Sequence, residues 1–385
     1  MNRSANMVLC IVAALVGFGL VMNYSVSTGT FAEHPEQSYP GVMKHFICIL
    51  AGAGAFWCMA GYRYQGLRDW WKLVVGLTVA LLSAVLFLGT MRNGARRWFI
   101  LYGQVAFQPS EVAKVAVPIF VAAYVSLRGR EELRSLRGFL VGLGVVCVMA
   151  GLILLEPDFG TATLVGAVGL LTLVVFGVRP IYALGMMVPG AGLMVLIALT
   201  KTYMRERILM WIDPWRDPQG TGYHIIQSLI AIGSGGVCGK GLAWSEQKLW
   251  YLPEANTDFI FSIIGEEFGL CGSIAVIILF VLLLREGIRI AKNAPDAFGS
   301  ALAFGITMMI TVQAAFNIAV TTKSVPTKGI SLPFISFGGS SMLLALAAVG
   351  ILVNIARQGV APATAPAGSA AVTSAAGSAS AAGAG

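Results

Sequence analysis

The feature that most constrains the fold of this chain is a repeated pattern of apolar runs, each about as long as a bilayer is thick. A transmembrane helix needs roughly 20 mainly apolar residues, and ten stretches of about that length alternate with polar connections. They are residues 7–27, 43–60, 73–91, 110–127, 139–156, 160–178, 181–200, 257–284, 299–320 and 334–356. The sequence therefore predicts an all-α polytopic membrane protein with about ten transmembrane helices.

The composition excludes several other classes of protein. Hydrophobic residues make up 57% and charged residues 11% of the 385 residues, a balance outside that of soluble globular proteins. The formal net charge of +8 comes from basic residues scattered through loops, so nucleic acid is not an expected partner. The six cysteines form no CxxC motif and the three histidines no HExxH spacing. We therefore expect no disulfide, no zinc site and no organic cofactor.

The distribution of basic residues predicts how the chain is oriented. Cytoplasmic loops are enriched in Lys and Arg, and every connection on the N-terminal side of the membrane carries at least one. These residues are Arg3, Arg63, Arg68, Lys72, Arg128, Arg130, Arg134, Arg137, Arg179, Arg285, Arg289, Lys292 and Arg357. Both termini are therefore predicted to be cytoplasmic, and residues 201–256 to form a large extracytoplasmic loop.

Two segments outside the predicted spans differ in character. Residues 201–256 are rich in Trp, Gly and Pro, which is typical of a functional loop at the membrane interface. Within them, residues 223–232 predict a short amphipathic or re-entrant helix. Residues 1–358 form the predicted membrane domain. Residues 359–385, mostly Ala, Gly and Ser, predict a disordered cytoplasmic tail.

The segment 253–267, Pro-Glu-Ala-Asn-Thr-Asp-Phe-Ile-Phe followed by Ser-Ile-Ile-Gly-Glu-Glu, is the most informative stretch for function. It predicts that Asp258 lies in the first turn of a helix at the membrane boundary, where a carboxylate can contact a lipid headgroup. The alternative is that Thr257 caps this helix and Asp258 only complements its dipole. Glu266 and Glu267 would lie about two turns deeper, where an unpaired carboxylate is costly and needs a compensating group.

Four further motifs lie on the predicted outer face, and each leaves a structural alternative open. Arg97, in residues 93–98, is suited to bind phosphate oxygens or to snorkel at a helix end. Glu111 and Lys114, in the motif 108–114 whose Ser110 is a predicted N-cap, either face a wet cavity or simply pair with each other. The turn 156–160 predicts a cap for the next helix. Residues 326–341 contain Pro and Gly that interrupt a helix, which is tolerated where backbone lines protein or a cavity.

The charges also distinguish between two classes of function. Outer loops carry cations that break the orientation trend, including Arg97, Arg207 and Lys328, and a site for an anionic headgroup explains them. A transporter is expected to carry polar residues near the membrane midplane. Because the charges lie toward the outer face, the pattern favours an enzyme that acts on a lipid-linked anionic substrate.

In these motifs, and over about residues 7–358, the sequence resembles the SEDS family (shape, elongation, division and sporulation). The form of residues 326–341, with Lys328 and the doubled Ser340-Ser341, is closer to the division branch, FtsW, than to the elongation branch, RodA. The sequence departs from the usual pattern at Asn256, often His in the family, and at Trp250, often a carboxylate in division members. The resemblance implies ten transmembrane helices with the large loop between the seventh and eighth.

The resemblance further implies a peptidoglycan glycosyltransferase that polymerises lipid II at the outer face of the bacterial cytoplasmic membrane. Such a reaction needs a base and positive charge for the leaving pyrophosphate. We assign Asp258 as the general base and Glu111 as a second candidate for acid-base chemistry. We assign the anionic substrate to Arg97, Lys114, Lys328 and Ser340. A divalent cation, Mg or Mn, shared between Asp258 and the phosphates is compatible with this set.

The resemblance also implies partners and a location. We expect a class B penicillin-binding protein, which crosslinks the strands, together with other division proteins at the septum. Small residues between Gly299 and Ala315 predict a packing face for that partner on the helix 299–320. A lipid II flippase, a scaffold that only activates a partner, and a RodA-like polymerase of cell elongation remain the alternatives.

Overall fold

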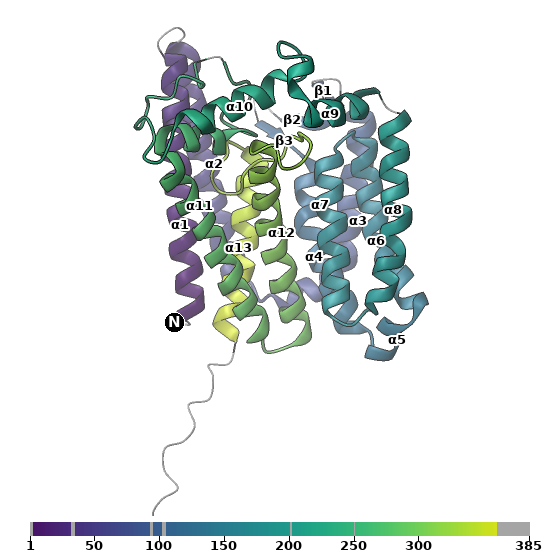
Figure 1. Ribbon diagram of the computed structural model, residues 1–385. Coiled ribbons are helices and arrows are strands. Elements are labelled where there is room, and N and C mark those ends of the chain that lie inside the picture. The colour runs from purple at the N-terminus through teal and green to yellow at the C-terminus, as the bar shows by residue number, and fades with distance from the viewer. Residues whose placement is uncertain are drawn as a thin grey trace, which may run out of the picture.

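The protein is a bundle of long helices whose connecting segments collect at its two ends (Figure 1). The computed structural model describes residues 3–31, 35–92, 95–101, 105–200, 202–249 and 251–359. The predicted tail beyond residue 359, Trp250, and the start of the motif 93–98 lie outside the described residues.

Ten long helices of the described chain coincide with the ten predicted apolar stretches. They are α1 (Arg3–Phe31), α2 (Pro35–Gly61), α3 (Gln65–Leu88), α4 (Pro109–Leu127), α6 (Leu136–Leu155), α7 (Phe159–Val175), α8 (Pro180–Thr200), α11 (Ile260–Lys292), α12 (Ala297–Thr321) and α13 (Gly339–Gln358). Eight are long and apolar enough to cross a membrane by length and composition. Of the other two, α7 is apolar and has 17 residues, and α8 has 21. The predicted fold class is confirmed.

Shorter elements occupy the two ends of the bundle. They are α5 (Arg130–Arg134), α9 (Thr202–Ile212), the 3₁₀-helix η1 (Pro214–Arg216), α10 (Tyr223–Ser234), β1 (Thr90–Arg92), β2 (Ala95–Leu101) and β3 (Val105–Phe107). The strands form a small antiparallel sheet in the order β1-β2-β3. The short helix predicted at 223–232 is confirmed as α10. Five predicted helical ends are wrong: residues 89–91, 156, 176–178, 257–259 and 334–338 lie in turns, loops or a strand.

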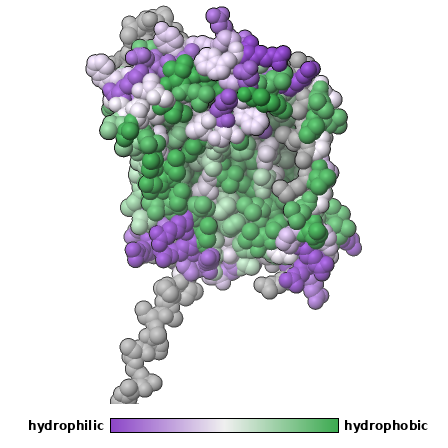
Figure 2. Space-filling view, in the orientation of Figure 1, coloured by the Kyte–Doolittle hydropathy of each residue, from purple (hydrophilic) through white to green (hydrophobic). Residues whose placement is uncertain are grey.

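The surface separates into a hydrophobic belt between two hydrophilic ends, as a membrane requires (Figure 2). The beginning of α1 and the end of α13 lie at the same end of the bundle as α5 (Figure 1). The strands, α9 and α10 lie at the opposite end. The two ends of the described chain are thus on one side, as the basic residues predict.

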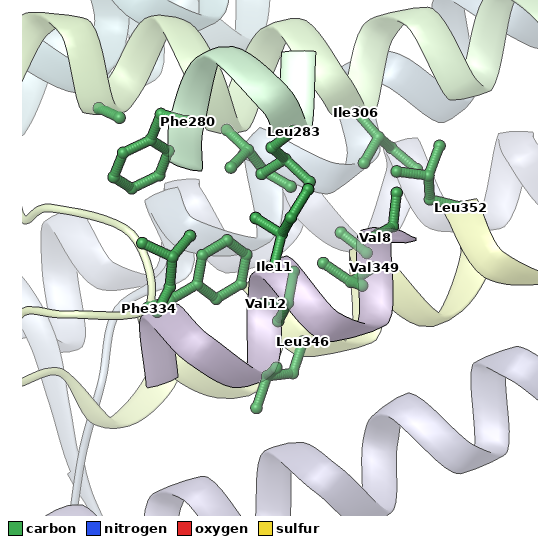
Figure 3. Packing of buried hydrophobic residues seen from close by; sticks show 14 of the residues in the cluster. Val8, Ile11, Val12, Phe280, Leu283, Ile306, Phe334, Leu346, Val349 and Leu352 are labelled. Carbon is green, nitrogen blue, oxygen red and sulfur yellow. The ribbon is translucent and has the colours of Figure 1, made fainter. Parts of the chain in front are cut away.

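The core lies between α1, α11, α12 and α13, where Ile11, Leu283, Ile306 and Leu352 pack together (Figure 3). The small residues of α12 belong to this interior: Ala301 and Ala303 are fully buried. A Cβ on Gly305 would lie 3.0 Å from Cβ of Pro118 in α4. The predicted partner face is therefore wrong for five of its six small residues, which are buried within the chain: Gly299, Ala301, Ala303, Gly305 and Ala314. Ala315 is exposed, and its contact with a partner stays a prediction.

We expect cysteines at Glu246 and Glu131 to report on opposite sides of the membrane. Both positions are exposed, the first in the 201–256 loop and the second in α5. In cells, with the native cysteines replaced, an impermeant thiol reagent should modify Glu246→Cys and leave Glu131→Cys unmodified, because loops rich in Lys and Arg stay inside. Modification of Glu131→Cys alone would show that the chain has the opposite orientation in the membrane to the predicted one.

Candidate functional site

Asp258 lies in a turn before α11 and not within the helix. The helix begins at Ile260 after an N-cap residue, Phe259, that makes no side-chain capping bond. The Thr257 hydroxyl donates to the backbone carbonyl and carboxylate of Glu254, at 3.3 and 3.0 Å. Neither the predicted position in the first helical turn nor the capping alternative is correct. The turn is instead closed by backbone bonds from Thr257 and Phe259 to Glu254.

Three hydrogen bonds from other segments fix this turn. The Asn317 side chain of α12 donates to the Asp258 carbonyl at 2.8 Å. The Ser336 hydroxyl donates to the Thr257 carbonyl at 2.6 Å, and the Phe337 amide donates to the Asn256 carbonyl at 2.8 Å. Two of the three come from the interrupted segment before α13. Because Asn256 takes part through its backbone, the departure from His at this position leaves that contact intact.

The Asp258 carboxyl group faces the backbone of Gly329, where a Cβ would lie 2.7 Å from its Oδ2 atom. Burial raises the pKa of Asp258 to about 7, with further contributions from Glu254 and Asp158, while Arg207 and Arg97 act in the opposite direction. The carboxyl group therefore titrates near neutral pH. That property is the one that a general base needs.

Lys328 precedes Gly329, whose backbone faces this carboxyl group, and brings a cation into the same segment. Its Nζ atom lies 5.8 Å from the centre of the Phe316 ring. Burial, and then the charge of Arg207, lower the pKa of Lys328, while Asp158 raises it. Among the described residues no carboxylate lies within ion-pair distance of this ammonium group. Arg207, predicted as an outer cation but not assigned to the substrate, reaches the same segment and donates to the Thr327 carbonyl at 2.8 Å.

Arg97 has a structural role that the sequence did not reveal. It lies on strand β2, and its Nε and Nη2 atoms donate to the carbonyls of Glu156 and Pro157, both at 2.7 Å. It therefore holds the outer turn between α6 and α7, and its remaining N–H groups are the ones left for an anion. In the same turn, Asp158 caps α7 by accepting from the Thr161 amide at 3.1 Å, which confirms the predicted cap.

Glu156 stands out in this turn because its side chain is fully buried and neither carboxyl oxygen has a hydrogen-bond partner among the described residues. Burial raises the pKa of Glu156 to about 8, and Asp158 adds to the rise while Arg97 lowers it. The carboxyl group is therefore neutral at pH 7. No local pattern in the sequence distinguishes Glu156 from an exposed turn residue.

We expect Glu156→Gln to stabilise the protein at high pH. In the folded chain the group keeps its proton up to about pH 8, whereas the unfolded chain loses it near 4.5. The stability that it contributes is thus present below 4.5 and is lost as pH rises through 8. Thermal unfolding in detergent should show the variant above wild type at pH 9 and not at pH 5. The exposed control Glu131→Gln should shift neither value, and equal curves at pH 9 would contradict the expectation.

Glu111 and Lys114 form a buried ion pair of 2.6 Å on α4, so the pairing alternative is confirmed. The pair also lines a small, partly open cavity. Its lining combines Glu111, Lys114, Gln313 and Ser341 with the apolar side chains of Val115, Ile306, Met309, Ile310, Pro333, Leu344, Ala345 and Ala348. The predicted N-cap is wrong, since α4 begins at Pro109 with Gln108 at the cap position.

Helix α12 connects the cavity to the Asp258 turn. Gln313 and Asn317 lie one turn apart, and their side chains donate to the carbonyls of Ser331 and Ile330 at 2.9 and 2.7 Å. The same loop thus borders both places. Ser340 lies beside the cavity and accepts from the Gln108 amide at 3.4 Å, while its neighbour Ser341 lines the cavity.

The described residues contain no group of three or more His, Cys, Asp or Glu side chains that could hold a metal ion. This described part of the chain therefore offers no preformed cage of protein ligands. Mg²⁺ is often bound by one or two carboxylates together with substrate phosphates. Asp258 can supply one such carboxylate. A divalent cation shared between Asp258 and the substrate phosphates stays a prediction.

Comparison with known proteins connects this arrangement to a family. The sequence profile of the FtsW, RodA and SpoVE group, described as a cell cycle protein, matches residues 5–360. "Probable peptidoglycan glycosyltransferase FtsW" of Geobacter metallireducens is 37% identical and covers 90% of this chain and 93% of its own. Stage V sporulation protein E of Bacillus subtilis is 39% identical and covers 92% and 97%.

Solved structures show the same fold. A chain of a peptidoglycan synthase complex, solved to explain the coordination of polymerization and crosslinking, aligns with a TM-score of 0.73 and 27% identity. That alignment covers 91% of this chain and 96% of the other. RodA of Thermus thermophilus aligns with a TM-score of 0.68 and 25% identity over 92% and 97%. This chain therefore belongs to the SEDS family, the family of FtsW, RodA and SpoVE.

Proposed function

We propose that this protein is a peptidoglycan glycosyltransferase that polymerises lipid II at the outer face of the cytoplasmic membrane during cell division. The observation that carries the proposal is the Asp258 carboxyl group: burial raises its pKa to about 7, and it faces the segment 327–329, which carries Lys328 and is contacted by Arg207. Relatives named as peptidoglycan glycosyltransferases of the FtsW type support the activity. The FtsW name of these relatives, which are 37% and 39% identical over about 90% of this chain, supports a role in division.

The chemistry follows from the charges around Asp258. The 4-hydroxyl of an acceptor sugar attacks the anomeric carbon of the donor strand, with inversion at that carbon. As the new glycosidic bond forms, an Asp258 oxygen takes the hydroxyl proton. The bond from the anomeric carbon to undecaprenyl pyrophosphate breaks, and its electron pair leaves with the pyrophosphate. Lys328 and the free N–H groups of Arg97 stabilise the charge that develops there.

The cavity next to this turn suits a lipid-linked substrate. Its walls are mostly apolar, and Glu111 and Lys114 lie among them as a compact pair. Lys114 keeps N–H groups that Glu111 does not use, so it can contact an anionic headgroup while remaining paired. We assign Glu111 to the orientation of Lys114. No step of the reaction is assigned to a metal ion; loss of polymerisation with a chelator, restored by Mg or Mn, would add one.

Glycan-strand formation should increase with pH and level off above about pH 7. The base must be ionised, and the pKa of Asp258 is about 7, so the active fraction falls tenfold for each pH unit well below that value. Initial rates from pH 5 to 9 with saturating lipid II would give the profile. A rate independent of pH across this range would show that Asp258 is not the titrating group.

A liposome assay separates the proposed enzyme from its alternatives. Purified protein is placed in vesicles with labelled lipid II in one leaflet, and both polymer and translocated lipid are measured. Polymer without translocation supports the proposal. Translocation without polymer identifies a flippase. A scaffold would yield neither product on its own. Polymer would then appear only after an active partner enzyme is added, and Asp258→Asn would not change its amount.

The proposal extends to partner and place. We propose a class B penicillin-binding protein as the crosslinking partner, together with other division proteins at the septum, and cytoplasmic termini. The match to a chain of a complex that coordinates polymerization and crosslinking supports the first. The start of α1 and the end of α13 lie at the same end of the bundle, which supports cytoplasmic termini.

A further inference from the structure

Helix α11 is interrupted at Gly269, and a loop from another part of the chain completes its hydrogen bonds. Gly269 has φ 64° and ψ −157°, which no helix contains. The freed carbonyls of Glu266 and Glu267 accept from the amides of Lys240 and Gly241, at 2.9 and 3.0 Å. The freed amides of Leu270 and Cys271 donate to the carbonyls of Gly236 and Val237, at 2.9 and 3.1 Å. The loop 235–249 is thus held by backbone hydrogen bonds at the point where α11 is interrupted.

The fully buried carboxylate of Glu266 accepts hydrogen bonds from the next part of this loop. Lys240 Nζ donates to it at 2.9 Å, and the Ser245 hydroxyl also donates. The amides of Glu246 and Gln247 donate at 3.1 and 3.3 Å. Four groups of the loop therefore converge on this carboxylate. A buried carboxylate with this set of donors fixes the backbone around it.

Glu267 makes a second buried pair, which ties the same loop to α1. Lys248 Nζ lies 2.8 Å from Glu267 Oε1, and both side chains are at most 2% exposed. The Ser25 hydroxyl donates to Glu267 at 2.6 Å and accepts from Lys248 at 3.0 Å. These pairs satisfy the compensation that the sequence predicted for two carboxylates at membrane depth. They connect residues 19 to 242 positions apart, so no local pattern could reveal them.

The loop continues directly into the turn that holds Asp258. The Leu252 amide donates to the Gln247 carbonyl at 2.9 Å, and Leu252 is buried. We propose that Glu266 and Glu267 are positioning residues, which hold the loop 235–249 and through it set the place of Asp258. This inference rests on the proposed function, because it assumes that Asp258 is the base.

The Asp258 turn is thus fixed from two sides. Asn317, Ser336 and Phe337 hold the turn itself. Glu266 and Glu267 hold the segment that precedes it. Loss of the second support leaves the catalytic carboxyl attached to the bundle but free to shift, and displacements of about 1 Å can cost 10²-fold in rate.

The chain offers a matched pair of variants, because two glutamates share Lys240. Glu266 is fully buried, and Glu246 is 74% exposed with its carboxylate 3.5 Å from the same ammonium group. Glu266→Gln removes the charge that pairs with Lys240 and turns one oxygen acceptor into an N–H donor, which neither the Lys240 ammonium nor the two backbone amides can accept, so we expect the loop to move. We expect a fall of about 10²-fold in the maximal rate of strand formation with little change in the lipid II concentration for half-maximal rate. Glu246→Gln should stay within about twofold of wild type.

A distance measurement distinguishes positioning from general loss of structure. Spin labels at Pro253→Cys and Leu127→Cys, both exposed and placed on a background without native cysteines, report the loop against the end of α4. Glu266→Gln should change their distance distribution, and Glu246→Gln should not. Full activity of Glu266→Gln would overturn the proposal. Slow polymerisation with an unchanged distance would overturn it as well.

The second pair provides a test if Glu266→Gln fails to fold. Glu267→Lys and Lys248→Glu should each be inactive, because each leaves two like charges buried together. The double variant restores opposite charges, and Ser25 can bond to either arrangement. Recovery of at least tenfold in rate over either single variant supports the proposal, and no recovery overturns it. Asp258→Asn, measured in parallel, distinguishes the positioning proposal from the assignment of the base. If that variant is active, Asp258 is not the base, whatever effect the changes at Glu266 and Glu267 have.

Discussion

Asp258→Asn should abolish glycan-strand formation while membrane insertion survives. Asn keeps the size of Asp and the backbone contacts of the turn, since Asn317 bonds to the Asp258 carbonyl and not to its side chain. Removal of a general base typically slows a reaction by about 10²- to 10⁴-fold. The measurement is strand formation from labelled lipid II by purified wild-type and variant proteins, each with its crosslinking partner.

Two further observations sharpen this test. The helix-capping alternative predicted almost no effect, and it no longer applies because α11 begins at Ile260 without a side-chain cap. Asp258→Glu should retain little activity, since one added methylene moves the carboxylate by about 1 Å toward a backbone that already approaches closely at Gly329. Strands made at nearly the normal rate by Asp258→Asn would rule out Asp258 as the base.

The second large effect concerns the buried pair on α4. Glu111→Ala and Lys114→Ala should each lower stability by about 3 to 5 kcal/mol, because each leaves an uncompensated buried charge. The double variant removes both charges and should be less destabilised than either single one. Unfolding of the purified protein in detergent would measure all four forms of the cycle.

Strand formation should be measured for the same four proteins, because it tests whether the pair also has a role in substrate binding. If Lys114 also contacts the anionic part of the substrate, the double variant regains stability but still makes few strands. The exposed ion pair Arg128–Glu132 is a matched control, and its cycle should show about 1 kcal/mol or less. Recovery of both stability and strand formation in the Glu111→Ala, Lys114→Ala protein would leave the pair a purely structural role.

The sequence by itself determined the membrane architecture and the segments that form the site. Apolar length and the placement of Lys and Arg are local properties, because the bilayer acts on each segment separately. Ten apolar stretches therefore predicted ten long helices, and the Pro and Gly of residues 326–341 predicted the interruption that now holds the Asp258 turn. The cap at Asp158 is equally local, and it too was predicted correctly.

The tertiary structure alone decided which groups meet. Glu266 and Glu267 needed partners, but Lys240, Lys248 and Ser25 come from a distant loop and from another helix. Small residues on α12 predicted a face for a partner, and all of them except the exposed Ala315 turned out to be buried within the chain. A small side chain permits close approach by any helix, whether its own chain or another supplies it. Local patterns specify what a segment can contact, whereas the packing of the whole chain selects the contact that forms.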